Sequence, residues 1–149
     1  VAWTERERAM DEPALELTDQ PTQEALDFLF RQLSAFNDAD VGPSQRQPLA
    51  VFLRDTEGAI VAGLSGYTAW GWLYVQWLWI AEAQRGRRLA ARMLTAAEDE
   101  ALRRGCHHAF IDTFNPAAER AYRRQGYAPF GRLEDFPSGR ARIFLRKPL

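Results

Sequence analysis

Residues 84–90 read QRGRRLA and residues 115–127 read NPAAERAYRRQGY, and these two stretches decide the fold. The first follows the apolar run Tyr74–Ile80 and leads into a helical pattern, which predicts a strand, a basic turn and a helix in that order. The helix is indicated by apolar residues at helical spacing: Leu89, Met93, Leu94, Ala97 and Ala101. The second stretch predicts a short helix and then a strand, because Asn115 and Pro116 favour a helix start and Gly126 a helix end.

The basic turn has the features of an anion site. The first backbone N–H groups of a helix have no partner within it, and the helix dipole is positive at this end, so the turn suits a pyrophosphate. Gly86 lets the backbone approach an anion without a Cβ in the way. Arg85, Arg87 and Arg88 add mobile positive charge at the same place. Such turns occur in α/β proteins of many functions, so this one alone does not identify a function.

Together the two stretches resemble the motifs of the GNAT superfamily of N-acetyltransferases. The cofactor motif of that family runs Arg or Gln, two residues, Gly, one residue, and Gly or Ala, and here this register falls on Arg85, Arg88 and Ala90. Arg88 therefore stands where the family has Gly, although Gln84, the Arg85-Gly86 pair and Leu89 match the usual wording. The family's later pattern is matched in register throughout, at Asn115, Ala118, Tyr122, Gly126 and Tyr127.

A looser resemblance, to one bacterial branch of the superfamily, extends over residues 48–149. It includes PLAVFLRD (48–55), GWLYVQWLWIAE (71–82) and FGRLEDFPSG (130–139). The resemblance implies an α/β (α+β) fold with a mixed, mostly antiparallel central sheet, flanked by helices and splayed between strands 4 and 5. Since 149 residues is the size of one domain, we expect residues 1–149 to form a single GNAT-like acetyltransferase domain.

Apolar periodicity and turn residues predict the elements before the basic turn. A first strand is expected to end at Leu15–Leu17, a helix to cover Thr22–Asn37, and a loop to cover Asp38–Gln47. The helix would have Leu26, Leu29, Phe30 and Leu33 on one face. Three strands are expected next, at 49–54, 59–68 and 72–80.

The same reasoning predicts the elements after the turn. We expect a helix over 87–104, a strand over 108–112, a helix over 116–125, and two final strands over 128–133 and 140–146. Trp72 and Trp77 fall on opposite faces of an unbroken strand, so the strand 72–80 is predicted to be covered on both sides. Most of the tryptophans around this strand are expected to be core residues.

Composition disfavours several other classes of protein. The chain has no run of about eighteen uncharged apolar residues and no signal-like start, so a cytoplasmic protein without a membrane partner is expected. Cys106 is the single cysteine, and with only His107 and His108 beside it we predict a core thiol, no metal site and no covalent catalysis. The pI of about 6.2 lacks the basic bias of a protein that binds nucleic acid.

Charge is divided unevenly along the chain. Residues 1–84 carry 13 acidic and 5 basic side chains, whereas residues 85–149 carry 7 acidic and 14 basic ones. A basic half suits a cofactor that bears phosphates, and an acidic half would attract a cationic amine. The alternative is that these charges only solvate different helices.

The resemblance also implies roles for individual residues. Tyr122 corresponds to the tyrosine that lies near the cofactor sulfur in this family and is its usual general acid; the alternative is a helix tyrosine packed on the sheet. Backbone groups of Leu78, Trp79 and Ile80 would follow the pantetheine arm, which Asn115 would also reach. The turn would bind the pyrophosphate through Arg85, Gly86, Arg87, Arg88, Leu89 and Ala90.

The general base is left open by the sequence. Glu82 follows the strand 72–80 and is a weak candidate, because this position is more often structural or solvated in the family. Tyr74 and Gln76 share one face of that strand, and Asp112 ends the next one, so each is a further candidate.

The resulting expectation is an N-acetyltransferase that moves an acetyl group from acetyl-CoA to a primary amine by direct attack in a ternary complex. The acceptor, a small molecule or a peptide, cannot be chosen from the sequence, and a homodimer is left open. A non-catalytic acyl-CoA-binding module is the main alternative, because Arg88 departs from the motif and no base is evident. An interaction domain without a CoA site would require both motifs to be coincidental.

Overall fold

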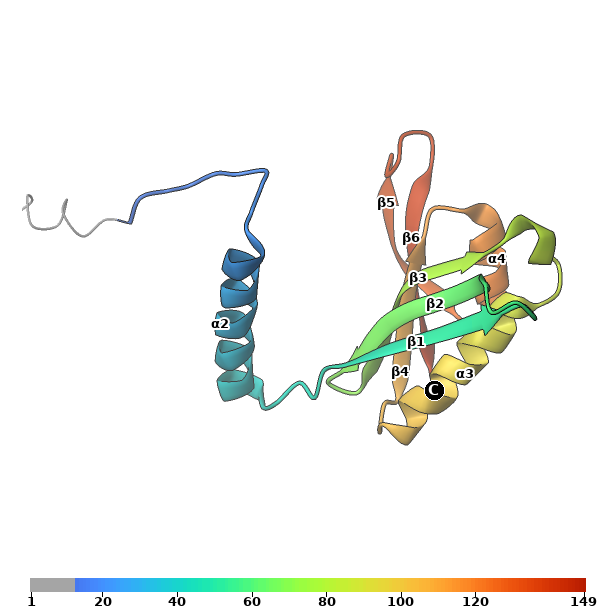
Figure 1. Cartoon of the computed structure of the whole chain (residues 1–149), viewed down its shortest axis with the longest axis horizontal. Coiled ribbons are helices and arrows are strands. Elements are labelled where there is room, and N and C mark those ends of the chain that lie inside the picture. The colour runs from blue at the N-terminus through green and yellow to red at the C-terminus, as the bar shows by residue number, and fades with distance from the viewer. Residues whose placement is uncertain (1–12) are drawn as a thin grey trace, which may run out of the picture. The chain divides into compact units, whose positions relative to one another are not determined.

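The structure is a computed structural model, and it describes residues 13–149. The chain divides into two compact units, one that ends at Gly42 and one that covers Pro43–Leu149. The candidate site lies entirely in the second unit, which holds all six strands that the structure describes (Figure 1).

The first unit contains one described helix, α2 (Gln23–Val41). Thr22 caps its start, since its hydroxyl accepts the Ala25 N–H at 3.2 Å. The predicted end at Asn37 is wrong: no helix-breaking residue follows until Gly42, which has a φ of +90° and ends the helix. The predicted strand at Leu15–Leu17 is also wrong, because this segment pairs with no other strand in the described part of the chain.

The second unit is a six-stranded sheet in the order β1-β2-β3-β4-β6-β5. Only the β3–β4 pair is parallel. The strands are β1 (Gln47–Arg54), β2 (Ile60–Ala69), β3 (Trp72–Ile80), β4 (His108–Thr113), β5 (Ala128–Glu134) and β6 (Ala141–Pro148). Each lies where the hydrophobic pattern predicts a strand, so the predicted mixed, mostly antiparallel sheet is confirmed.

Two helices cover one face of this sheet. α3 (Leu89–Arg103) packs against β1, β2 and β3, and α4 (Pro116–Arg124) packs against α3 and β4. The predicted apolar stripe of α3 enters the core, where it meets alternate residues of the strands. The largest fully buried side chains of this core are Leu64, Leu73, Val75, Met93, Leu94, Ile111 and Leu145.

A buried carboxylate joins α3 to the C-terminal strands. Glu98 is 6% exposed, and its carboxylate accepts the Tyr127 hydroxyl at 3.0 Å and Lys147 Nζ at 2.7 Å. The amide of Gln125, just after α4, also donates to Glu98 at 3.3 Å. A buried charge is tolerated when it is paired and hydrogen-bonded, and this network fixes α3 against α4 and β6.

A β-bulge in β3 changes the predicted arrangement of its aromatic residues. Ser65 of β2 pairs with Trp77, but the next residue, Gly66, pairs with Val75, so Gln76 is an extra residue in β3. The extra residue shifts the alternation by one, and Trp72 and Trp77 lie on the same face. The prediction that they lie on opposite faces is wrong, because it assumed that side chains alternate between the two faces along the whole strand, which does not hold across a bulge.

Gly66 makes the bulge sterically feasible. A Cβ built on Gly66 would lie 1.9 Å from the carbonyl oxygen of Tyr74 and 3.1 Å from the Cα of Val75. No side chain fits there, so only glycine allows β2 to approach β3 at this point.

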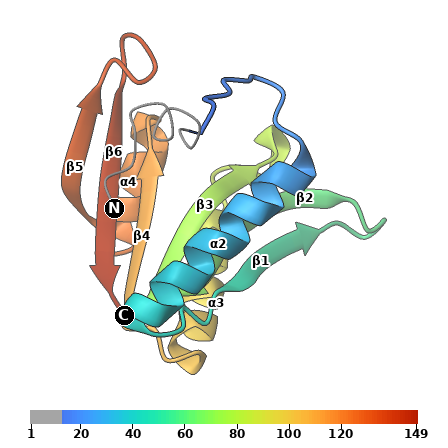
Figure 2. The same ribbon diagram turned by 90° about the vertical axis from the view of Figure 1, so that its left-hand side faces the viewer.

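β3 and β4 separate soon after they meet. Their ladder covers only Trp72–Val75 of β3 against His108–Ile111 of β4, while β3 continues to Ile80 and β4 stays paired with β6. Figure 2 shows the two strands diverging toward the top of the view. This is the predicted splay between strands 4 and 5. In the structure these strands are β3 and β4, because the expected first strand is absent from the described residues.

Candidate active site

One end of the site is the turn that links β3 to α3. A short 3₁₀ helix, η1 (Glu82–Gln84), follows β3, and the chain then turns at Gly86 with a φ of +76°. Arg88 is the N-cap of α3 and has left-handed angles, φ +57° and ψ +28°. This conformation explains why glycine suits the position, since a Cβ makes it costly.

The start of α3 is open to an anion. Among residues 13–149 no side chain caps this helix, and its first turn has no acidic residue. The carbonyl of Arg88 accepts the N–H of Arg92 at 3.2 Å, so the N–H groups of residues 89–91 precede any helical acceptor. If the turn binds a pyrophosphate as predicted, Leu89 and Ala90 would contribute backbone donors rather than side chains.

The arginines of the turn differ in how they are held. Arg85 Nε donates to the Ile80 carbonyl at 3.2 Å, and Arg87 Nη1 donates to the Gln84 side chain at 2.6 Å. Arg88 has an exposed side chain and borders an open groove of about 460 Å³ along α3. The groove is lined by Arg88, Ala91, Arg92, Thr95, Ala96 and Asp99.

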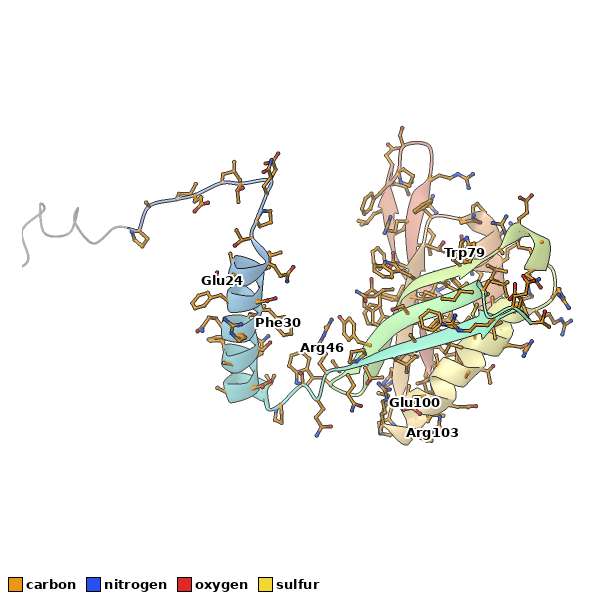
Figure 3. All side chains as sticks on the ribbon, in the orientation of Figure 1. Glu24, Phe30, Arg46, Trp79, Glu100 and Arg103 are labelled. Atoms are coloured by element: carbon orange, nitrogen blue, oxygen red, sulfur yellow. The ribbon has the colours of Figure 1, made fainter. Side chains whose placement is uncertain are left out.

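The predicted pantetheine segment forms the β3 side of the splay. Leu78 and Ile80 pair with Leu64 and Ala62 of β2 and face the helices, whereas Trp79 faces the other way and is 53% exposed (Figure 3). The β3–β4 ladder ends at Val75, so the edge of this segment that faces β4 pairs with no strand in the described part of the chain. An unpaired strand edge offers backbone donors and acceptors to an extended ligand.

α4 contributes the other two predicted residues. Asn115 caps the helix, because its side-chain oxygen accepts the N–H groups of Ala117 at 2.8 Å and Ala118 at 3.2 Å. Its oxygen is therefore committed to α4. Tyr122 is only 4% exposed and belongs to the core cluster on the helix side of the sheet. Burial, and then the negative charge of Asp112, raise the pKa of Tyr122 to about 12, so its hydroxyl is protonated at neutral pH.

A polar cluster lies where β3 and β4 part, on the face opposite α3. The Tyr74 hydroxyl donates to Asp112 Oδ1 at 3.0 Å, and Arg142 Nη1 of β6 donates to Asp112 Oδ2 at 3.0 Å. The Arg142 guanidinium lies 4.1 Å from the ring centroid of Phe136 and 5.3 Å from that of Phe114. Sequence reasoning named Tyr74 and Asp112 as separate candidates. It missed Arg142, because the register of β6 on β4 leaves no mark in a single sequence.

Glu82 lies away from this cluster. It is exposed on η1, beyond the end of β3, and the six steps along the strand from Tyr74 to Ile80 span about 20 Å of extended chain. Glu82 is thus next to the basic turn, and it stays a weak candidate for the base. Gln76 is exposed at the bulge.

Cys106 is 2% exposed, just before β4, which confirms the predicted core thiol. Burial raises the pKa of this thiol, so little of the nucleophilic thiolate forms at neutral pH. It borders a cavity of about 450 Å³ near the start of β3, whereas the basic turn follows the other end of that strand. Within residues 13–149, no group of three His, Cys, Asp or Glu side chains is placed to hold a metal ion. None of the described helices has the length and apolarity to cross a bilayer.

Comparison with known proteins agrees with this arrangement. Acetyltransferase Atu2258 of Agrobacterium fabrum is 41% identical over 131 residues, which cover 88% of this chain and 96% of that protein. Blasticidin-S acetyltransferase of Streptomyces morookaense is 31% identical over 109 residues, 70% of this chain and 80% of that one.

Solved structures share the fold. A crystal structure of a protein from Agrobacterium tumefaciens, assigned as an acetyltransferase, has a TM-score of 0.88 at 39% identity and covers 92% of this chain and 100% of its own. A structure from Bacillus anthracis, assigned as a streptothricin acetyltransferase and solved with acetyl coenzyme A, has a TM-score of 0.62 at 15% identity, covering 72% of this chain and 64% of its own. Residues 9–127 match the Acetyltransferase (GNAT) family. The chain therefore belongs to the GNAT family of acetyltransferases.

Proposed function

We propose that this protein transfers an acetyl group from acetyl-CoA to a primary amine, by direct attack within a ternary complex. The splay of β3 from β4 carries this proposal, because the unpaired end of β3 leads to an uncapped helix start, and α4, which packs against β4, holds a buried, protonated tyrosine. The family match crosses the boundary between the two units, which supports one acetyltransferase domain over residues 1–149.

The residues of the splay fit the parts of acetyl-CoA. The N–H groups at the start of α3, with Gly86, Arg85, Arg87 and Arg88, would bind the pyrophosphate. The free edge of β3 at Leu78–Ile80 would bind the pantetheine arm by backbone hydrogen bonds. The side-chain amide of Asn115 would reach the same arm with its N–H groups, because its oxygen caps α4.

Tyr122 would assist the departure of the thiolate. The amine nitrogen forms a bond to the carbonyl carbon, the carbon–sulfur bond breaks with its electron pair going to sulfur, and the nitrogen loses one proton to water. A thiol has a pKa of about 8.5, so a phenol whose pKa is about 12 is the weaker acid of the two. Tyr122 therefore stabilises the thiolate mainly by donating a hydrogen bond rather than by complete proton transfer.

The acceptor is proposed only as a class. One relative is named for blasticidin-S, so a small molecule with a primary amine is the first choice, with peptide N-termini as the second. The acceptor site differs among proteins that share a fold, and it must be found by screening.

Two measurements test the function. Calorimetric titration with acetyl-CoA and with CoA should show binding that weakens in an Arg87→Ala, Arg88→Ala variant. Release of free thiol should depend on the amine across a panel of blasticidin S, spermidine and a peptide with a free N-terminus. Tyr122→Phe should lower kcat at least tenfold while the Kd for acetyl-CoA changes less than threefold.

A non-catalytic acyl-CoA-binding module is the second candidate, because Arg88 occupies the glycine position of the motif. Binding of acetyl-CoA without thiol release for any amine would favour this module. A folded protein that binds neither acetyl-CoA nor CoA would refute both functions. Equal turnover by wild type and Tyr122→Phe would remove the role of Tyr122 alone.

A further inference from the structure

The proposed function leaves open which group receives the amine. The cluster of Tyr74, Asp112 and Arg142 lies where the β3–β4 ladder ends. Val75 and Ile111 are the last paired residues of the β3–β4 ladder, Tyr74 precedes the first of them, and Asp112 follows the second. The bond between Tyr74 and Asp112 thus crosses the ladder diagonally at the point where the strands part.

Two tyrosines lie on opposite faces of the sheet. Tyr122 comes from α4 on the helix side, within the core cluster. Tyr74 alternates with the buried residues Leu73 and Val75, so it lies on the other face. Burial, and after it the interaction with Asp112, raise the pKa of both tyrosines, and only the Tyr74 hydroxyl is seen to bond to that carboxylate, at 3.0 Å. In the attack on a thioester, the nitrogen approaches perpendicular to the carbonyl plane while the sulfur lies in that plane, so the two atoms need separate hydrogen-bonding partners.

Asp112 itself is poorly suited to receive an ammonium group or act as the base. Its side chain is 12% exposed, one oxygen accepts from Tyr74, and the other is paired with Arg142. The guanidinium already balances its negative charge, and the rings of Phe136 and Phe114 flank that guanidinium. A carboxylate held in this way orients its partners.

Tyr74 has the free hydrogen-bonding capacity that Asp112 lacks. Its ring stacks on Phe110 with centroids 4.3 Å apart, and it meets the edge of Tyr67 at 5.6 Å, so the hydroxyl is held in one place. The hydroxyl donates its only hydrogen to Asp112. The remaining lone pairs of the oxygen can only accept a hydrogen bond, and the N–H of a neutral primary amine is a matching donor.

We propose that the Tyr74 hydroxyl accepts a hydrogen bond from the acceptor amine, and that Asp112 and Arg142 are positioning residues that hold this hydroxyl. The inference rests on the proposed N-acetyltransferase function. Tyr74 orients the nitrogen lone pair toward the carbonyl, and no proton moves to Asp112. The acceptor is therefore recognised at this point as a neutral primary amine, rather than as an ammonium group held by a carboxylate.

The test compares Tyr74→Phe with Tyr67→Phe, a neighbouring tyrosine on the same face. Tyr74→Phe should lower kcat/KM for the amine about tenfold, the worth of one hydrogen bond, while acetyl-CoA affinity stays within twofold. Tyr67→Phe should leave both values within twofold. A merely structural role for Tyr74 would instead change stability and acetyl-CoA affinity together.

Substitutions of Asp112 separate positioning from base catalysis. Asp112→Asn keeps an oxygen for the Tyr74 hydroxyl, so it should retain at least a third of kcat/KM, whereas Asp112→Ala should match Tyr74→Phe. The double variant Tyr74→Phe, Asp112→Ala should be no worse than either single change, because both remove the same interaction.

Other results would overturn the inference. An unaffected Tyr74→Phe would refute it while leaving the enzyme assignment intact. If Asp112→Asn is as inactive as Asp112→Ala, Asp112 is a base and the positioning role is wrong. Absence of amine-dependent thiol release by the wild-type protein would refute the proposed function, and this inference with it.

Discussion

Replacing Arg88 by glycine should stabilise the protein. Arg88 has a φ of +57° and a ψ of +28°, and this conformation costs a residue with a Cβ about 1–2 kcal/mol. Glycine removes that cost but adds freedom to the unfolded chain, which offsets about 0.4–1 kcal/mol. The net gain is about 0.5–1 kcal/mol. For a chain of this size, it corresponds to an increase in Tm of about 1–4 °C.

Arg87→Gly is the matched control. Arg87 is one residue earlier, has a negative φ, and donates to Gln84 at 2.6 Å. Glycine here gains nothing from the backbone and loses a hydrogen bond, so Tm should fall. We therefore expect the change in Tm to be positive for Arg88→Gly and negative for Arg87→Gly. Differential scanning fluorimetry can measure both.

The same pair of variants tests the anion site. Backbone N–H groups at the start of α3 would remain in Arg88→Gly, so acetyl-CoA affinity should fall by no more than about fivefold, the worth of one exposed cation. Calorimetry provides this value. A lower Tm for Arg88→Gly would refute the strain argument, and a loss of affinity far beyond fivefold would show that the Arg88 side chain clamps the phosphates.

Three further predictions concern stability. Glu98→Gln should lower the free energy of unfolding by about 2–4 kcal/mol in urea denaturation, because Lys147 loses its buried counter-charge; a loss below 1 kcal/mol would contradict this. Gly66→Ala should yield little folded protein, since its Cβ would collide with backbone, whereas Gly131→Ala, where a Cβ meets only ordinary contacts near 3.7 Å, should fold, as circular dichroism would show. Burial raises the pKa of Tyr122 to about 12, so its contribution to stability is complete below the unfolded pKa of 10.0 and is lost as pH rises from 10 to 12; an unchanged urea midpoint across that range would contradict it.

The order of the elements in the second unit was predictable because it depends on local patterns. Alternating strands, the helical stripe of α3 and the Asn115-Pro116 start of α4 each lie within a few residues, and all appear where expected. The turn before α3 was predictable for the same reason, since Gly86 and its neighbouring arginines directly precede a helix. Helix ends were less predictable, as the extension of α2 to Val41 shows.

The far side of the site depends on pairing between distant strands. Arg142 meets Asp112 only because β6 pairs with β4 in one particular register. The bulge at Gln76 depends on the absence of a side chain at Gly66, a residue on another strand. Neither relation has a local sequence signal, so Arg142 and Gly66 could not be identified as part of the site from one sequence.

The bulge in β3 also gives the molecule an intrinsic optical reporter. Because the side-chain alternation of β3 shifts at Gln76, the indole rings of Trp72, Trp77 and Trp79 all lie on one face of the sheet, and Trp77 is 75% exposed. An iodide ion in solution would quench the exposed indoles, and a molecule that covers this face would protect them and shift their emission to shorter wavelength. Binding of an acceptor could thus be followed by fluorescence without a label, before its chemical identity is known.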